Sequence, residues 1–318
     1  MAYGLSAGYA EAYESFLEYI KPRRSVQGYI SLRKNTRRIL RWFETEEISL
    51  DQAGIQDCIR YKNELGSLVK KDGTALSVGT VNNRLKAGKS LFKYLASAGE
   101  INADPFREVP YPRMPERISR NVLNEAQTGR LLNRLLEFDG ERTAGRRLGH
   151  YRLHVISEFL YATGLRISEA AALIPANIDP QSRTVFVPEG KGRKARFAFM
   201  TGFASEVMFH YLSRGRKAVL ARGNRKYGQT VFGTHPERLM ALVNRGLMRE
   251  CRQLGLPVIT SHGFRHSLGT HLLHAGCDMR YIQVILGHES LKTTQVYTRV
   301  DKDKLKDSLD TFHPRRWP

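Results

Sequence analysis

The chain has 318 residues, 41% of them apolar, so it is long enough for two domains with real hydrophobic cores, and disorder throughout is excluded. No stretch reaches the roughly 18 consecutive apolar residues of a membrane span, and no secretory signal opens the chain. Three widely spaced cysteines indicate a reducing compartment. The net charge of +20 makes a polyanion the expected partner, because phosphate neutralisation releases counterions.

The first hundred residues predict a bundle of helices. Apolar side chains recur at helical spacing in three runs, at residues 13–20, 32–43 and 81–95. Asp51 is the expected N-cap of a further helix that includes Ile55 and Leu65. We therefore expect residues 1–106 to form a helical domain.

Basic side chains interleave with the apolar positions of two of these helices. The candidates for contact with a DNA backbone are Arg33, Arg37, Arg41, Arg84, Lys86 and Lys89. Exposed helix faces often carry such residues for solvation alone. Two basic helices in a chain of this charge nevertheless favour DNA binding, so we interpret residues 1–106 as a DNA-binding domain.

Prolines mark a boundary after the predicted bundle. Four of them lie within residues 104–118, where they prevent a continuous helix and favour an extended chain. We place a linker at residues 107–119 and a second domain at residues 120–318. The net charge is +5 for residues 1–118 and +15 for the remainder, so we expect the second domain to bind more phosphates.

The second domain begins with helical patterns and then changes period. Residues 184–187 and 196–200 are β-rich and flank a basic tip with two glycines, which predicts a β-hairpin. Helices resume near residue 203. The expected fold class is mainly α: a helical bundle followed by a mixed α/β domain, mostly helical, with a small antiparallel sheet.

The C-terminal third combines residues that suit chemistry at a phosphate. His262 and His266 are four residues apart, but Gly263 stands where a zinc protease needs its glutamate, and Arg265 between them repels a cation. Phosphoryl transfer fits better, because two arginines can clamp the non-bridging oxygens of a phosphodiester with forked donors. The residues available for such a site are Arg166, Lys191, His262, Arg265, His288 and Tyr297.

Five short motifs resemble, in order, the conserved boxes of the tyrosine recombinases, also called the phage integrase family. They are Ala162-Thr-Gly-Leu-Arg166, Glu189-Gly-Lys191-Gly, His262-Gly-Phe-Arg265-His, Leu286-Gly-His288 and Thr293-Thr-Gln-Val-Tyr297. One such motif alone would be weak evidence. Five in the family's order, with a matching two-domain layout, are specific.

The resemblance implies a role for each motif residue. Tyr297 would attack the scissile phosphate to form a 3′-phosphotyrosyl link and release a 5′-hydroxyl, so no ATP is required. Arg166 and Arg265 would hold the non-bridging oxygens. Lys191, on the hairpin, would protonate the leaving oxygen.

The remaining residues would support that reaction. By the same resemblance, His262 would manage the phenolic proton, and His288 would donate a hydrogen bond to the phosphate. Glu169 lies one helical turn after Arg166 and would orient groups of the site. Arg193 and Lys194 share the hairpin tip and are further candidates for DNA binding. No cofactor and no metal are implied.

The family resemblance also implies partners. Double-stranded DNA would be held between the two domains, and four protomers, a dimer on each site, would exchange strands through a Holliday junction. The apolar stripe of Leu305, Leu309 and Phe312 predicts a tail that docks into a neighbouring protomer. Such a protein would work at the bacterial nucleoid in the cytoplasm, without a membrane. Integration, excision and dimer resolution, an Xer or a mobile-element subgroup, and accessory proteins stay open.

Two alternatives share part of this pattern. A type IB topoisomerase uses similar residues but relaxes DNA as a monomer, whereas the short spacing between His288 and Tyr297 and the tail favour a recombinase. A non-catalytic DNA-binding regulator would lack at least one motif residue, and each is present.

Overall fold

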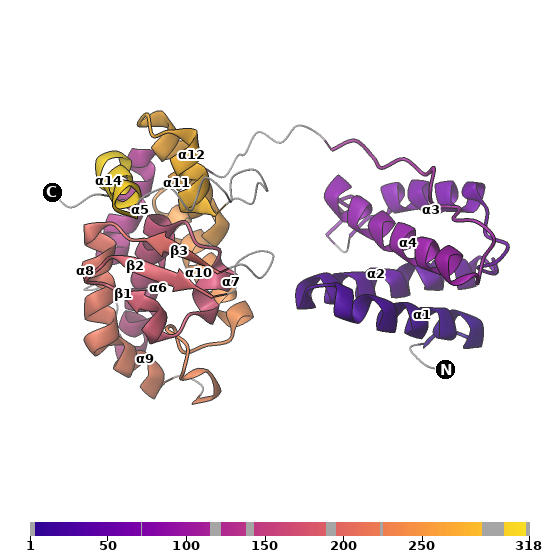
Figure 1. Cartoon of the computed structure of the whole chain (residues 1–318), viewed down its shortest axis with the longest axis horizontal. Helices are drawn as coiled ribbons and strands as arrows, with labels where there is room; N and C mark the ends of the chain where they lie inside the picture. The colour runs from indigo at the N-terminus through magenta and orange to yellow at the C-terminus, as the bar shows by residue number, and fades with distance from the viewer. Residues whose placement is uncertain are drawn as a thin grey trace. The chain divides into compact units, whose positions relative to one another are not determined.

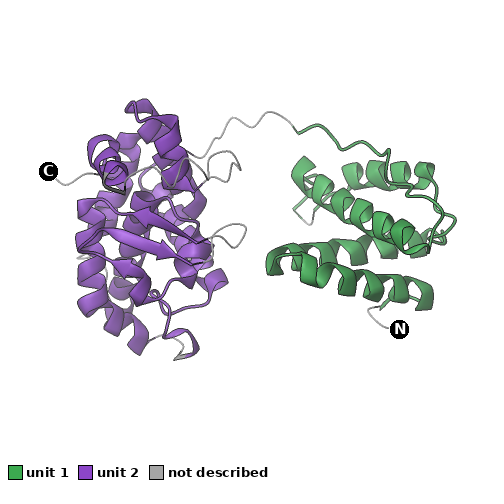
Figure 2. Ribbon diagram, in the orientation of Figure 1, with its two compact units in different colours: residues 1–118 green, residues 119–318 purple. Residues whose placement is uncertain are grey.

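The structure is a computed structural model, and it describes residues 4–70, 72–114, 122–137, 143–188, 195–222, 225–287 and 302–315. The chain divides into two compact units, residues 1–118 and residues 119–318 (Figure 2). Each unit has its own hydrophobic core. Within the described ranges, no helix is both long enough and apolar enough to cross a membrane.

The first unit is a bundle of helices (Figure 1), and its core is rich in aromatic side chains. Its elements are α1 (Ala7–Ile20), the short η2 (Lys21–Arg23), α2 (Val26–Thr45), α3 (Ile55–Ser67) and α4 (Val78–Ala98). Phe92 of α4 packs against Phe43 of α2 and against Phe106 beyond α4, each with 5.2 Å between ring centroids. All three rings are fully buried. They therefore join α2, α4 and the segment that leads towards the predicted linker.

The predicted cap of the third helix is wrong. Helix α3 has Gly54, not Asp51, as its N-cap, and Asp51 is exposed. The carboxylate that satisfies this helix end belongs to Asp57 inside the first turn, and it accepts a hydrogen bond of 2.9 Å from the Gly54 amide. A side chain at the third helical position thus replaces the expected cap.

The second unit is mainly helical. Its helices are α5 (Glu125–Leu136), α6 (Ala144–Thr163), α7 (Ile167–Ala172), η3 (Pro175–Asn177), α8 (Gly202–His210), η5 (Tyr211–Gly215), α9 (Arg216–Ala221), η6 (Arg225–Tyr227), α10 (Pro236–Gln253), α11 (Ser261–His274), α12 (Met279–Leu286) and α14 (Lys302–Phe312). Every residue from 153 to 165 is buried, and α6 contacts α5, α8, α10 and α11. Helix α6 is therefore the central element on which the site is built.

A small sheet lies against these helices. Strands β1 (Ile178–Asp179), β2 (Thr184–Val187) and β3 (Arg196–Phe199) form an antiparallel sheet in that order. In the predicted hairpin, Val187 pairs with Arg196, which fixes the register beside the tip. The expected fold class, mainly helical with a small antiparallel sheet, is confirmed.

The C-terminal helix differs from its predicted state. Leu305 and Leu309 of α14 are buried in the core of their own unit, where α14 contacts α12 and β3. Burying a leucine side chain contributes about 1.5–3 kcal/mol. In the isolated chain the stripe therefore packs against its own domain, and Leu305 and Leu309 are not exposed to solvent.

Candidate active site

A tight helix ending places the first arginine. Helix α6 ends at Gly164, whose φ of +60° is a left-handed conformation that favours glycine. A Cβ at this position would also collide with Leu286 and approach Leu268 closely. After the buried Leu165 the chain turns back, and Arg166 becomes the N-cap residue of α7. Arg166 thus stands at the junction of α6 and α7.

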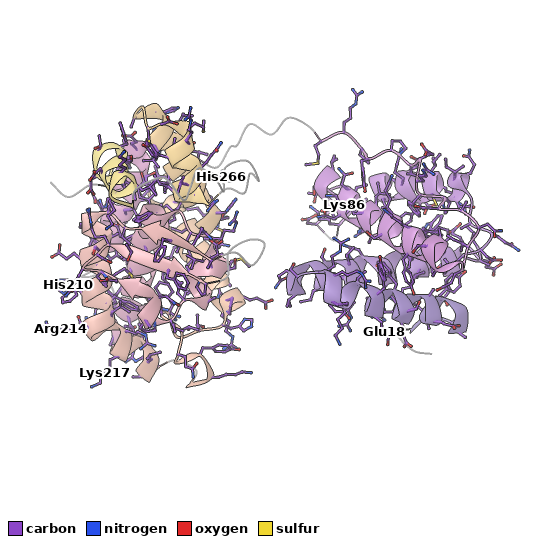
Figure 3. All side chains as sticks on the ribbon, viewed as in Figure 1. Glu18, Lys86, His210, Arg214, Lys217 and His266 are labelled. Carbon is purple, nitrogen blue, oxygen red and sulfur yellow. The ribbon has the colours of Figure 1, made fainter. Side chains whose placement is uncertain are left out.

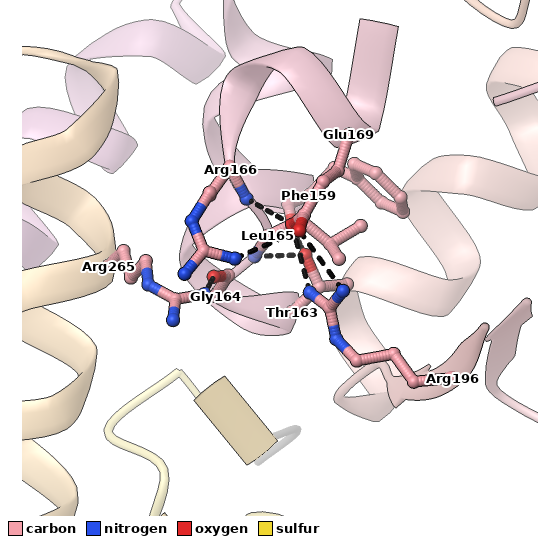
Figure 4. A network of polar contacts seen from close by, with 8 residues as sticks. All are labelled: Phe159, Thr163, Gly164, Leu165, Arg166, Glu169, Arg196 and Arg265. Carbon is pink, nitrogen blue, oxygen red and sulfur yellow. Dashed lines mark hydrogen bonds and ion pairs between the residues drawn. The ribbon is translucent and has the colours of Figure 1, made fainter. Parts of the chain in front are cut away.

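Glu169 binds both the backbone and the side chain of Arg166. Its carboxylate is nearly fully buried and accepts hydrogen bonds of 2.9 Å from both the backbone amide and the Nη1 of Arg166. Arg196 of β3 occupies the same carboxylate from the other side, with bonds of 2.8 and 3.0 Å (Figure 4). Burial opposes ionisation here, but the hydrogen bonds and charges of Arg196 and Arg166 lower the pKa of Glu169 below its ordinary value. The glutamate is therefore an ionised anchor between two guanidinium groups.

Arg265 comes from a distant part of the chain. It lies on α11, is 4% exposed, and donates a hydrogen bond of 2.6 Å from Nη1 to the carbonyl oxygen of Gly164. Its Nη2 is buried and has no hydrogen-bond partner among the described residues. Burial and then the charge of Arg166 lower the pKa of Arg265 to about 10, so it stays protonated at neutral pH. Figure 4 shows both side chains entering one region of the site.

His262 completes the described part of the site. It lies one turn before Arg265 on α11 and packs against His266, with 4.5 Å between ring centroids and the rings edge to face. Burial, followed by the charges of His266, Arg265 and Arg166, lowers the pKa of His262. A neutral imidazole at pH 7 is suited to accept a proton.

Helix α11 is held in place by the first described residues of the second unit. The amide of Leu123 donates to Ser267 at 3.2 Å, and the carbonyl oxygen of Leu123 pairs with the imidazole of His271 at 2.8 Å. The other ring nitrogen of His271 pairs with the hydroxyl of Tyr161 on α6 at 2.7 Å. His271 therefore ties the helix that carries His262 and Arg265 both to α6 and to the start of the unit.

The structure thus brings together Arg166, Glu169, His262 and Arg265, which are far apart in sequence. The other predicted residues of this site, Lys191, Arg193, Lys194, His288 and Tyr297, lie outside the described residues. Arg196 was not among the residues that the sequence pointed to. The signal that could have found it is a basic residue at the start of a strand that follows a basic hairpin tip.

The predicted DNA-binding residues of the first unit divide into two groups. Arg33, Arg37 and Arg41 follow one another at intervals of four on α2, so they share a face. A Cβ at Gly4 would lie within 4 Å of the guanidinium groups of both Arg37 and Arg41. The guanidinium groups of Arg37 and Arg41 therefore lie close to each other and beside Gly4, near the N-terminus.

The second group lies on α4. Burial and the charge of the neighbouring Arg38 lower the pKa of Arg84. Lys86 is exposed (Figure 3), whereas Lys89 donates to the carbonyl oxygen of Arg107 at 3.2 Å and lies over the ring of Tyr111. Lys89 therefore holds the start of the predicted linker.

Comparisons with known proteins decide the family. Residues 122–304 match the model of the phage integrase family. The chain belongs to this family. It is 31% identical to tyrosine recombinase XerC of Bacillus pumilus over 97% of this chain and 90% of that protein. It is 34% identical to tyrosine recombinase XerC of Halalkalibacterium halodurans over 74% of this chain and 76% of the relative.

Two solved structures share the fold of this chain. The integrase of transposon Tn1549, in complex with circular intermediate DNA, matches with a TM-score of 0.64 and 20% identity over 96% of this chain and 99% of that one. The XerH recombinase bound to its difH substrate matches with a TM-score of 0.64 and 19% identity over 90% and 80%. On the family match and the tyrosine recombinase relatives at 31% and 34% identity, this family member is a tyrosine site-specific recombinase, and neither alternative is favoured.

Proposed function

We propose that the recombinase cleaves one DNA strand by attack of Tyr297 on the scissile phosphate. The Tyr297 Oη–P bond forms while the P–O5′ bond breaks, and the phosphate remains attached to the protein as a 3′-phosphotyrosyl ester. His262 accepts the phenolic proton, and Lys191 donates one to the departing O5′. Attack by the 5′-hydroxyl of a partner strand reverses the step and completes the exchange.

The unpartnered Nη2 of Arg265 carries this proposal. A buried cationic donor without a partner costs free energy, so its position suits an anion that arrives with the substrate. Arg166, held by Glu169, and the neutral His262 lie around it. A phosphodiester offers the two non-bridging oxygens that such a pair of arginines can clamp, and His288 would add a hydrogen bond to the same phosphate.

We further propose that four copies act on two DNA sites, with two copies on each, and pass through a Holliday junction. Residues 1–106 would bind the duplex through Arg33, Arg37, Arg41, Arg84 and Lys86. The linker at 107–119 would join them to the catalytic domain, where Arg193 and Lys194 would also contact DNA. Docking of the stripe of Leu305 and Leu309 into a neighbour would require α14 to leave its own unit, where both side chains are buried.

A covalent trap tests the chemistry. Nicked duplexes tiled over the DNA that flanks the gene are incubated with the protein, and the adducts are digested and mapped by mass spectrometry. We expect nucleotide attached to Tyr297, no adduct with Tyr297→Phe, and no effect of EDTA. An adduct that persists with Tyr297→Phe, or one that EDTA abolishes, would refute the proposal.

A further inference from the structure

We infer that Arg196 is a positioning residue for strand cleavage, which acts through Glu169 to fix the guanidinium of Arg166 and to tie the β2–β3 hairpin to the phosphate clamp. The inference rests on the proposed roles of Arg166 and Lys191, but it assigns a function to a residue outside the five motifs. Three features of the structure carry it.

The first feature is the completeness of the hydrogen bonding around Glu169. Oε1 accepts from Nη1 of Arg166 and from Nη1 of Arg196, and Oε2 accepts from the amide of Arg166 and from Nη2 of Arg196. The four acceptor positions of the carboxylate are thus filled. Arg196 contributes two of them as a fork, the geometry that a lysine cannot reproduce.

This geometry determines how Arg166 is presented. Without Arg196, two acceptor positions of a buried carboxylate would be open, and Arg166 is the cation nearest to fill them. The Arg166 guanidinium would turn towards Glu169 and away from the phosphate. Arg196 therefore leaves Glu169 able to hold Arg166 by one Nη atom while its remaining donors stay available to substrate.

The second feature is that Arg196 faces inward. Its side chain is 19% exposed, and both of its terminal nitrogens are used by Glu169. A DNA phosphate would have to compete with that fork for Arg196. The residue is therefore suited to support the site and not to bind DNA, although it lies on a basic hairpin.

The third feature is the position of Arg196 between segments that lead to proposed catalytic residues. It pairs with Val187 in the hairpin that carries Lys191, and it holds Glu169 beside Arg166. It also packs against Gly287, where a Cβ would collide with its guanidinium. Gly287 directly precedes His288. One side chain thus connects the approaches to three residues of the site.

A second buried glutamate supplies a matched control. Glu250 is 1% exposed and pairs with the Nε of Arg249 at 2.7 Å and with Arg134 at 3.7 Å. Arg249→Gln therefore removes one of two partly exposed arginines that pair with a buried glutamate outside the candidate site. If Arg196 were only a structural ion pair, the two glutamine variants would behave alike.

The experiment separates cleavage from binding. Arg196→Gln, Arg196→Lys and Arg249→Gln are compared with wild type on a nicked duplex, with cleavage measured in single turnover at saturating DNA and affinity measured on the uncleaved duplex. We expect Arg196→Gln to cleave about 10–100-fold more slowly, as is typical of supporting residues, with affinity changed less than about threefold. Arg196→Lys should recover part of the rate, and Arg249→Gln should cleave like wild type.

A double variant tests the route through Arg166. In an Arg166→Lys background, the further change Arg196→Gln should lower the cleavage rate less than threefold, because the Arg166 guanidinium that Arg196 positions is already replaced. Three results would overturn the inference. Arg196→Gln could reduce the cleavage rate equally in the wild-type and Arg166→Lys backgrounds, or it could cleave at the wild-type rate. Arg196→Gln and Arg249→Gln could also reduce the cleavage rate equally. Intact cleavage by Arg166→Lys and Tyr297→Phe would instead refute the proposed function. Thermal melting of each variant identifies any that fails to fold. If Arg196→Gln does not fold, the cleavage rate of Arg196→Lys tests the inference in its place.

Discussion

Arg315 forms a bidentate ion pair with Glu158 in the middle of the central helix α6. Its Nη2 and Nε lie 2.6 and 3.1 Å from Oε1 of a carboxylate that is 1% exposed, and its Nη1 also reaches Asn133. The adjacent His313 is buried beside Tyr161. His313 and Arg315 are therefore bound to the core of their own unit in the isolated chain.

We expect Arg315→Gln to lower the free energy of unfolding by about 3–5 kcal/mol at pH 7, because it leaves a buried carboxylate without its partner. Urea unfolding followed by circular dichroism measures the change. The double variant Glu158→Gln with Arg315→Gln should recover most of the loss, since it removes the charge as well as its partner. A double variant as unstable as the single one would contradict this explanation.

The same pair predicts a pH dependence. Burial raises the pKa of Glu158 above its ordinary value despite the opposing effect of Arg315. A carboxyl group whose pKa is higher in the folded state loses stability as the pH rises through the interval between its unfolded and folded pKa values. Arg315→Gln raises the folded value further. The loss of unfolding free energy in Arg315→Gln should thus be largest at neutral pH and should become smaller as the pH is lowered. Urea unfolding at pH 5 and pH 7 measures it.

The second arginine of the clamp should not tolerate lysine. Arg265 uses Nη1 on the Gly164 carbonyl oxygen and leaves Nη2 for the phosphate, and one ammonium group cannot serve both positions. We expect Arg265→Lys to lose about 2–4 kcal/mol of transition-state stabilisation, or roughly 30- to 1,000-fold in cleavage rate, as when other donors to a developing anion are removed. Single-turnover cleavage of a nicked duplex checks this, and a loss below threefold would exclude a clamping role.

His266 should influence the acid limb of the pH–rate profile, which is the pH range in which the cleavage rate falls as the solution becomes more acidic. If neutral His262 accepts the phenolic proton, the rate falls as the pH drops through the pKa of His262, which burial, His266, Arg265 and Arg166 lower. His266→Gln removes one of these effects, so the pKa of His262 rises and the acid limb moves to higher pH. His274→Gln, at the exposed end of α11, is the control and should leave the limb in place. A limb that stays or moves to lower pH in His266→Gln would contradict the role of His262.

The face of α2 should contribute to the salt dependence of DNA binding. The slope of log affinity against log salt falls by about 0.9 for each phosphate that the protein no longer neutralises. We expect the double variant Arg37→Gln with Arg41→Gln to reduce that slope by about 1.8, measured by fluorescence anisotropy across salt concentrations. Arg23→Gln serves as the control, because its guanidinium packs over Tyr19 and donates to the Tyr19 carbonyl oxygen. An unchanged slope in the double variant would show that α2 is a solvated face.

Local patterns were sufficient to predict the main helices and the hairpin, and they brought forward the motif residues as candidates. Apolar periodicity places residues 32–43 on one helix, and the glycine-containing tip predicts the pairing of β2 with β3. The family motifs identified Arg166, His262 and Arg265 because each motif is contiguous. Such features depend on neighbours in sequence, which a sequence displays directly.

Other features depend on tertiary contacts and could not be predicted in this way. The position of Arg196 at the start of a strand is visible in the sequence, but its contact with Glu169 is not, because Glu169 lies on a different element. The tail stripe was expected to dock into a neighbouring protomer, but in the isolated chain Leu305 and Leu309 are buried beside α12 and β3 of their own unit, a contact that depends on the tertiary fold. Gly54 displaced Asp51 as a cap because Asp57 supplies the acceptor from within the helix.

The bonds of Leu123 have a mechanical consequence. Both of its backbone groups are fastened to α11, at Ser267 and at His271, and it lies just after the segment that joins the two units. The helix that carries His262 and Arg265 is therefore anchored through the main chain of a single residue, and a change in the backbone at Leu123 would disturb both of these bonds at once.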